Sequence, residues 1–139
     1  MLENQDNLME AVKRKDYILH FPYQKYDYVS HMLQEAADDP LVESIKITLY
    51  RVASKSKVAT TLLHALSNGK QVTAFIEAKA RFDEESNLYW GEKLQKAGAK
   101  VIYSYPGIKV HTKLFLIQRK EGSELKTVSY THLTLPTKA

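Results

Sequence analysis

Apolar side chains along the chain recur with two alternating periods, one typical of strands and one typical of helices. In residues 44–52, Ile45, Ile47 and Leu49 alternate with polar side chains, which indicates a strand with one buried face. In residues 57–69 the apolar side chains recur at helical spacing, and a glycine ends the segment. The same patterns predict further helices at 26–38 and 87–98, and further strands at 17–23, 71–80, 100–107, 110–119 and 125–130.

The order of these elements predicts the class of the fold. Strands that alternate with short helices indicate right-handed βαβ units. We therefore expect an α/β domain with a mostly parallel sheet, helices on both faces of the sheet, and a β-hairpin at the end, turned by residues 121–124. In open α/β sheets, ligands bind beyond the carboxyl ends of the strands, so the segments that follow the strands are the first place to look for a site.

Composition narrows the class of protein. The chain has 139 residues, which is the length of one domain, and it contains no cysteine. Disulfides and thiolate metal sites are thereby excluded, and a reducing compartment is favoured. No apolar stretch approaches the roughly 20 residues that a membrane-spanning helix needs. The first residues also lack the apolar centre of a signal peptide. We expect a cytoplasmic protein without a membrane span.

Charge adds the first functional hint. Twenty lysines and arginines against sixteen aspartates and glutamates give a net charge of +4. The basic side chains that follow predicted strands form three groups: Arg51, Lys55 and Lys57; Lys79 and Arg81; and Lys109, His111 and Lys113. Because the carboxyl ends of parallel strands meet at one edge, we expect the three groups to converge there. Such an arrangement suits a multiply charged anion.

The segment PGIKVHTKLFLIQRK at 106–120 is the most informative of these. In a strand, residues two apart point to the same face, so we expect His111 and Lys113 to lie side by side at the mouth of the strand 110–119. A buried ammonium group is costly without an anion. The alternatives are structural: a histidine bonded to a backbone carbonyl, a lysine whose head reaches solvent, and ordinary solvated arginines at 51 and 81.

Other polar residues give weaker signals. The acidic run at 83–85 is typical of a helix N-terminus, where the helix dipole favours negative charge, and a metal site is the alternative. His20, His31 and His64 have no partners at ligand spacing, and we treat them as structural. The sequence has neither a P-loop nor a dinucleotide-binding glycine motif.

Several stretches together resemble the polyphosphate kinase family. They are FPY at 21–23, IKITLYRVASKS at 45–56, NGKQVT at 68–73, EAKARFDEESN at 77–87, AGAKVIYS at 97–104 and PGIKVHTKLFLI at 106–117. The similarity is to the first of the family's two C-terminal domains, which resemble phospholipase D. It implies a partial domain over residues 16–127, preceded by a polar lead-in at 1–15. At 128–139 we expect a divergent or non-native tail, because Thr134, Leu135, Pro136 and Thr137 stand where the family has a G-T-G-N turn.

The resemblance implies an activity and a site. The activity is the reversible transfer of the terminal phosphate of ATP onto inorganic polyphosphate through a phosphohistidine, here His111, with Lys113 as a second catalytic residue. Arg51 and Arg81 match the arginines of the Mg²⁺-bound phosphate site. A guanidinium has no lone pair to donate, so we expect both arginines to bind phosphate oxygens that also hold the metal. The implied partners are ATP, polyphosphate and the remaining domains of a homo-oligomeric full-length enzyme, without which we expect this chain to be inactive.

Two other functions stay open. One is a phospholipase-D-like phosphodiesterase half-domain, but the aspartate of the motif H-x-K-x4-D is replaced here by Gln118, which favours the kinase. The other is a non-catalytic module that binds polyanions, which the positive net charge alone would allow.

Overall fold

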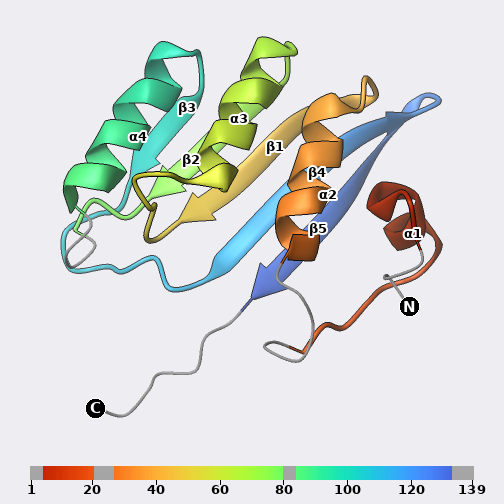
Figure 1. Cartoon of the computed structure of the whole chain (residues 1–139), viewed down its shortest axis with the longest axis horizontal. Helices are drawn as coiled ribbons and strands as arrows, with labels where there is room; N and C mark the ends of the chain where they lie inside the picture. The colour runs from red at the N-terminus through yellow and green to blue at the C-terminus, as the bar shows by residue number, and fades with distance from the viewer. Residues whose placement is uncertain (1–4, 21–26, 80–83, 133–139) are drawn as a thin grey trace.

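A computed structural model describes residues 5–20, 27–79 and 84–132 of the chain. Within these residues there are four helices and one five-stranded sheet (Figure 1). The helices are α1 (Leu8–Arg14), α2 (Asp27–Asp38), α3 (Lys57–Ser67) and α4 (Glu84–Lys96). The strands are β1 (Val42–Leu49), β2 (Gln71–Ile76), β3 (Lys100–Tyr103), β4 (Lys113–Glu121) and β5 (Glu124–His132).

The predicted elements are largely confirmed, with ends that differ by at most four residues. The strand expected at 17–23 is the exception. Residues 17–20 are not in a strand, and residues 21–23 lie outside the described residues. In the part of the chain that the structure describes, no helix combines the length and apolar content of a membrane span.

The sheet is mixed, with strand order β3-β2-β1-β4-β5. β1, β2 and β3 are parallel, whereas β4 is antiparallel to β1 and β5 is antiparallel to β4. The expectation of a mostly parallel sheet is therefore wrong. The antiparallel direction of β4 follows from residues 104–112, which contain no helix. This segment stays at the carboxyl ends of the parallel strands, so β4 has to run back in the opposite direction. The final hairpin is confirmed, and Gly122 turns it with a φ of 63°.

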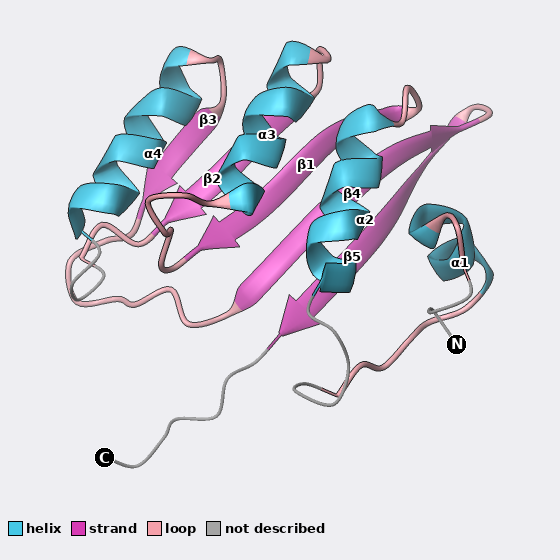
Figure 2. Ribbon diagram, viewed as in Figure 1, coloured by secondary structure: helices cyan, strands magenta, loops and turns pink. Residues whose placement is uncertain are grey.

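The helices α2, α3 and α4 lie side by side across one face of the sheet (Figure 2). The helices expected on the second face are not present among the described residues. α3 and α4 belong to two successive crossovers that step in the same direction along the sheet, and crossovers of one hand then place both helices on one face. The burial pattern agrees: Ile45, Ile47 and Leu49 are buried against the helices, whereas Lys46 on the opposite face is exposed.

The N-terminal helix α1 is attached to α2 and to the sheet by polar contacts. The carboxylate of Glu35 accepts hydrogen bonds from the backbone N–H groups of Leu8 (2.8 Å) and Met9 (2.9 Å). This satisfies two of the donors that a helix start leaves unpaired. The expected polar lead-in is thus partly folded, with Leu8, Met9 and Ala11 buried.

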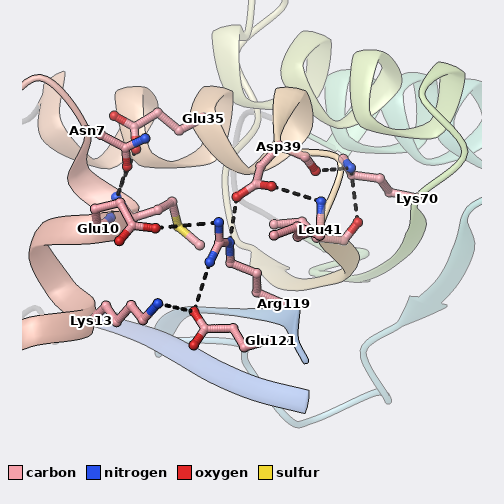
Figure 3. Close-up of polar contacts among 11 residues, drawn as sticks. Asn7, Glu10, Lys13, Glu35, Asp39, Leu41, Lys70, Arg119 and Glu121 are labelled. Carbon is pink, nitrogen blue, oxygen red and sulfur yellow. Dashed lines mark hydrogen bonds and ion pairs between the residues drawn. The ribbon is translucent and has the colours of Figure 1, made fainter. Parts of the chain in front are cut away.

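Arg119 of β4 makes the second attachment (Figure 3). Its guanidinium donates to Asp39 (2.7 Å) and Glu121 (2.8 Å), and Glu10 of α1 lies 3.5 Å away. Lys13 of α1 also contacts Glu121, at 3.2 Å. One arginine therefore connects α1, the end of α2 and the far end of the sheet, away from the carboxyl ends of the parallel strands.

Candidate functional site

The ring of Tyr50 lies at the centre of a group of polar side chains at the carboxyl end of β1. The guanidinium carbon of Arg51 is 5.5 Å from the ring centroid, and the Nζ atom of Lys113 is 5.0 Å from it. The imidazole of His111 lies 5.5 Å from the Tyr50 ring between centroids, tilted by 57°. The structure thus brings together three of the four predicted site residues, Arg51, His111 and Lys113.

The antiparallel pairing of β1 with β4 creates this meeting point. The hydroxyl of Thr48 accepts from the N–H of Leu114 (2.9 Å) and donates to the carbonyl of Thr112 (2.7 Å). These bonds hold the chain that enters β4 beside the end of β1. Residues 111–113 consequently lie next to residues 50–51, although a long stretch of sequence separates them.

His111 and Lys113 are close to each other, but not in the way the sequence predicted. β4 begins at Lys113, so His111 lies in the approach to the strand and not within it. The Nζ atom of Lys113 donates to the backbone carbonyl of His111 at 2.7 Å. The two residues lie near the same Tyr50 ring, but His111 is outside the strand on which the prediction placed it. β4 begins at residue 113, and not at residue 110 as predicted, because the irregular segment that follows β3 extends through residue 112.

A cavity of about 380 Å³ opens beside Tyr50. Arg51 and Lys113 contribute two cations to its wall, while most of the remaining wall is apolar and comes from β1, β4 and α2. His111 is solvent-exposed at this end of the sheet. Two cations next to an exposed imidazole, beside a largely apolar hollow, suit an anion that presents a reactive group to a nitrogen lone pair.

Arg81, the fourth predicted site residue, lies outside the described residues, as does Asp83 of the acidic run. Glu84 and Glu85 form the first turn of α4, where the helix-start interpretation placed them. Among the described residues, no group of three or more histidine, aspartate and glutamate side chains is arranged to hold a metal ion.

The basic side chains that the structure describes do not all line one cavity. Lys55 and Lys57 line a different hollow of about 1120 Å³, bordered by α2, α3 and α4. Lys79 and Lys109 line a third, of about 190 Å³. Lys55 and Lys57 are separated from Arg51 because α3 begins directly after Ser56. The hydroxyl of Ser56 caps this helix by accepting from the N–H of Ala59 at 3.1 Å, and the chain turns away from the strand ends there.

The remaining histidines with described ion pairs have structural surroundings. His64 lies 2.6 Å from a carboxylate oxygen of Asp38, and His31 lies 3.5 Å from Glu35. Gln118, at the position of the phosphodiesterase aspartate, accepts a hydrogen bond from the hydroxyl of Ser44 on the neighbouring strand at 2.8 Å. That side chain is thus engaged within the sheet.

Sequence reasoning missed Tyr50 as a site residue. The available signal was its position: a large aromatic side chain directly before Arg51, at the point where a strand reaches the ligand-binding edge of the sheet. An aromatic ring there attracts cations to its face.

Comparison with known proteins identifies the family. The family model "Polyphosphate kinase C-terminal domain 1" matches residues 7–135, which is most of the chain. The chain belongs to the polyphosphate kinase family. The polyphosphate kinases of Salmonella typhimurium (strain LT2) and Escherichia coli (strain K12) are each 46% identical to it over 127 residues. These 127 residues are 91% of this chain but 18% of each relative, so the chain spans about a fifth of their length.

Solved structures agree with this assignment. The crystal structure of polyphosphate kinase from Porphyromonas gingivalis superposes with a TM-score of 0.79 at 42% sequence identity. The match covers 99% of this chain and 24% of that one. Nuc, a phospholipase D family member from Salmonella typhimurium, matches with a TM-score of 0.52 at 12% identity, over 81% of this chain and 79% of its own. This second likeness supports the phospholipase-D-like fold alone.

Proposed function

We propose that this polyphosphate kinase domain carries the phosphorylated histidine, His111, of an enzyme that transfers the terminal phosphate of ATP to inorganic polyphosphate. The observation that carries the proposal is the meeting of His111, Arg51 and Lys113 around Tyr50 in a member of this family. A nucleophile with two cations beside it is what phosphoryl transfer requires.

The proposed reaction has two balanced steps. A neutral imidazole has a nitrogen lone pair, which attacks the γ-phosphorus of ATP. A nitrogen–phosphorus bond forms, the bond from that phosphorus to the β-phosphate oxygen breaks, and ADP leaves with the electron pair. The imidazole keeps the proton on its other nitrogen. In the second step a terminal oxygen of polyphosphate attacks the phosphorus of the phosphohistidine. An oxygen–phosphorus bond forms, the nitrogen–phosphorus bond breaks, and its electron pair returns to the imidazole, so the polymer gains one phosphate.

Arg51 and Lys113 stabilise the transferred group. The transition state of phosphoryl transfer spreads negative charge over three oxygens, and fixed cations are the main means of lowering its energy. Arg51 also presents a planar fork of donors that binds two phosphate oxygens at once. By its match to the family motif, Arg81 adds a second guanidinium.

Magnesium fits this site only through the substrate. Arginine and lysine have no lone pair for a metal, so Arg51, Arg81 and Lys113 would bind phosphate oxygens, and those oxygens would hold the ion. Bound in this way, Mg²⁺ neutralises part of the charge on the phosphates. The rest of the full-length enzyme, which we expect to be a cytoplasmic homo-oligomer, would complete the ATP site.

The phosphodiesterase alternative is less well supported. It needs an acidic side chain at position 118, where the chain has a glutamine bonded to Ser44. The polyanion-binding alternative needs no nucleophile, and so it gives no role to the exposed imidazole of His111.

Labelled ATP separates the three functions. A full-length relative, such as the Escherichia coli enzyme, is incubated with γ-³²P ATP, and the same is done with the variant that matches His111→Ala. Acid-labile, base-stable label in the wild type and none in the variant supports the kinase. Salt-sensitive polyphosphate binding without label supports the binding module, and release of product from a diester substrate supports the phosphodiesterase. We expect the 139-residue chain alone to make no polyphosphate.

A further inference from the structure

Asn87 is a fully buried amide that holds both neighbours of Arg51. It lies in the first half of α4 and has 0% exposed surface. Its Oδ1 atom accepts from the N–H of Val52 at 2.9 Å, and its Nδ2 atom donates to the carbonyl of Tyr50 at 2.8 Å. Arg51 stands between these two residues, so the amide fixes the backbone from which its guanidinium projects.

Two further side chains of α4 bind the same segment. The hydroxyl of Ser86 donates to the carbonyl of Val52, and the indole N–H of Trp90 donates to the carbonyl of Ala53 at 2.9 Å. α4 thus holds residues 50–53 by hydrogen bonds from three side chains, those of Ser86, Asn87 and Trp90. The segment that carries Arg51 is held firmly, although it has no regular secondary structure.

Glu77 holds the other half of the site. This carboxylate follows β2 and is 3% exposed. One of its oxygens accepts from the N–H of Val110 at 2.8 Å, and the other accepts from the hydroxyl of Ser104 at 2.8 Å and the N–H of Lys79 at 3.1 Å. Ser104 and Val110 are the two ends of the loop that leads into His111. One side chain therefore closes that loop.

The two side chains form one connected unit. The Nδ2 atom of Asn87 also donates to the backbone carbonyl of Glu77 at 2.9 Å. Burial raises the pKa of the Glu77 carboxyl, but the hydrogen bonds from Val110, Ser104 and Lys79 more than offset this and bring the pKa below its ordinary value. The carboxylate is therefore charged at neutral pH, and its hydrogen bonds are the stronger, charge-assisted kind.

We propose that Asn87 and Glu77 are positioning residues for phosphoryl transfer, which together fix the Arg51 guanidinium and the His111 imidazole relative to each other. This inference rests on the function proposed above. Neither side chain needs to touch the substrate. Position 87 requires an amide, because the group must accept from one N–H and donate to two carbonyls, and no other side-chain group of that size does both.

The experiment uses a full-length relative with substitutions at the matching positions. Asn87→Leu keeps the approximate shape and removes all three hydrogen bonds. The matched control is Lys70→Met: Lys70 is also buried, and its Nζ atom donates to the carbonyls of Asp39 and Val42, at the opposite end of the sheet. Thermal unfolding of both variants shows how much stability each has lost.

We expect Asn87→Leu to lower the kcat of phosphohistidine formation by about 100-fold, since small displacements of catalytic groups have effects of this size. Its KM for ATP should change much less, because the rest of the enzyme still binds the nucleotide. Lys70→Met should keep kcat within about twofold, as expected for a site remote from the chemistry. The proposal would be overturned if Asn87→Leu and Lys70→Met lost the same stability and the same kcat. An unchanged kcat in Asn87→Leu would also overturn it.

Hydrogen exchange supplies a readout that does not depend on activity. Peptides that match 50–53 should exchange faster in Asn87→Leu, peptides that match 104–111 should exchange faster in Glu77→Gln, and neither should change in Lys70→Met. Glu77→Gln also serves if Asn87→Leu does not fold: unchanged exchange and unchanged kcat in that variant would contradict the proposal. A failure of the proposed function looks different, because the label would then survive His111→Ala in the otherwise wild-type enzyme.

Discussion

The ring of Tyr50 and the imidazole of His111 lie 5.5 Å apart between centroids, one just after β1 and the other just before β4. The contact exists because β4 returns antiparallel to β1 and so begins where β1 ends. The same ring faces Arg51 and Lys113. One aromatic side chain thus contacts the imidazole that we propose as the nucleophile and two cations.

The Tyr50 ring should contribute to anion binding through the cations that it orients. We expect Tyr50→Leu to weaken tripolyphosphate binding by roughly 0.5–1 kcal/mol, the usual strength of an exposed cation–π contact, and Tyr50→Phe to have little effect. Calorimetric titration of the full-length relative with matching substitutions measures both. Tyr89→Leu, on the outer surface of α4, is the control. Equal weakening by Tyr50→Phe and Tyr50→Leu would show that the hydroxyl acts instead of the ring.

Gly91 should resist substitution although it lies inside a helix. Gly→Ala in a helix interior ordinarily stabilises by about 1 kcal/mol. Here the new methyl group would overlap the hydroxyl oxygen of Tyr103 and lie 3.0 Å from its Cζ atom. We expect Gly91→Ala to destabilise by about 1–2 kcal/mol, the usual cost of overpacking.

Tyr103→Phe provides the decisive background for that test, because it removes the overlapping oxygen. In this background Gly91→Ala should cost clearly less, although the close ring carbons remain, as measured by denaturant unfolding in a double-mutant cycle. If Gly91→Ala costs the same with either residue at position 103, the clash does not explain the glycine.

Arg119 should be important for the attachment of α1. Its side chain is 16% exposed and lies beside the largely buried carboxylates of Asp39 and Glu121, which would lose their cation in a region with little solvent. We expect Arg119→Met to cost on the order of 3 kcal/mol of unfolding free energy. Lys126→Met, which removes an exposed pair with Glu124, should cost less than about 1 kcal/mol. Similar losses in the two variants would refute the role assigned to Arg119.

Glu77 should make stability depend on pH. Its pKa in the folded chain lies below the ordinary value of 4.5, so the carboxylate stabilises the fold above that pH, and the contribution is lost as the pH falls through and below it. The stability difference between wild type and Glu77→Gln should therefore be largest near neutral pH and shrink in acid. Urea unfolding across the acid range measures it, and a difference that grows on acidification would contradict the prediction.

The order and type of most elements followed from the sequence because apolar periodicity reports which face each element buries. The direction of β4 did not follow, although the absence of a helical pattern between β3 and β4 was available as a signal. A parallel neighbour needs a crossover, and residues 104–112 cannot supply one. The second face of the sheet, which none of the described helices covers, was missed for a related reason: the face on which helices lie depends on the direction in which successive crossovers step.

The position of the candidate site could be predicted more fully than the side chains that support it. Arg51, His111 and Lys113 are polar residues beside strand ends, and that position can be read from the sequence. Asn87 was not recognised, although it shares a helical stripe with Trp90, Gly91 and Leu94, which are all buried. A lone amide on an apolar stripe indicates a buried hydrogen-bonding group. Its partners, in contrast, lie on two other loops that only the folded chain brings near.

The location of the phosphate on the enzyme tests the central claim most directly. A full-length relative is labelled with γ-³²P ATP, digested in alkali-compatible buffer, and its peptides are sequenced by mass spectrometry. We predict label on the peptide that matches residues 109–113, attached to the nitrogen of the residue that matches His111, and released by mild acid. Label on any other residue, or undiminished label after His111→Gln, would contradict the account.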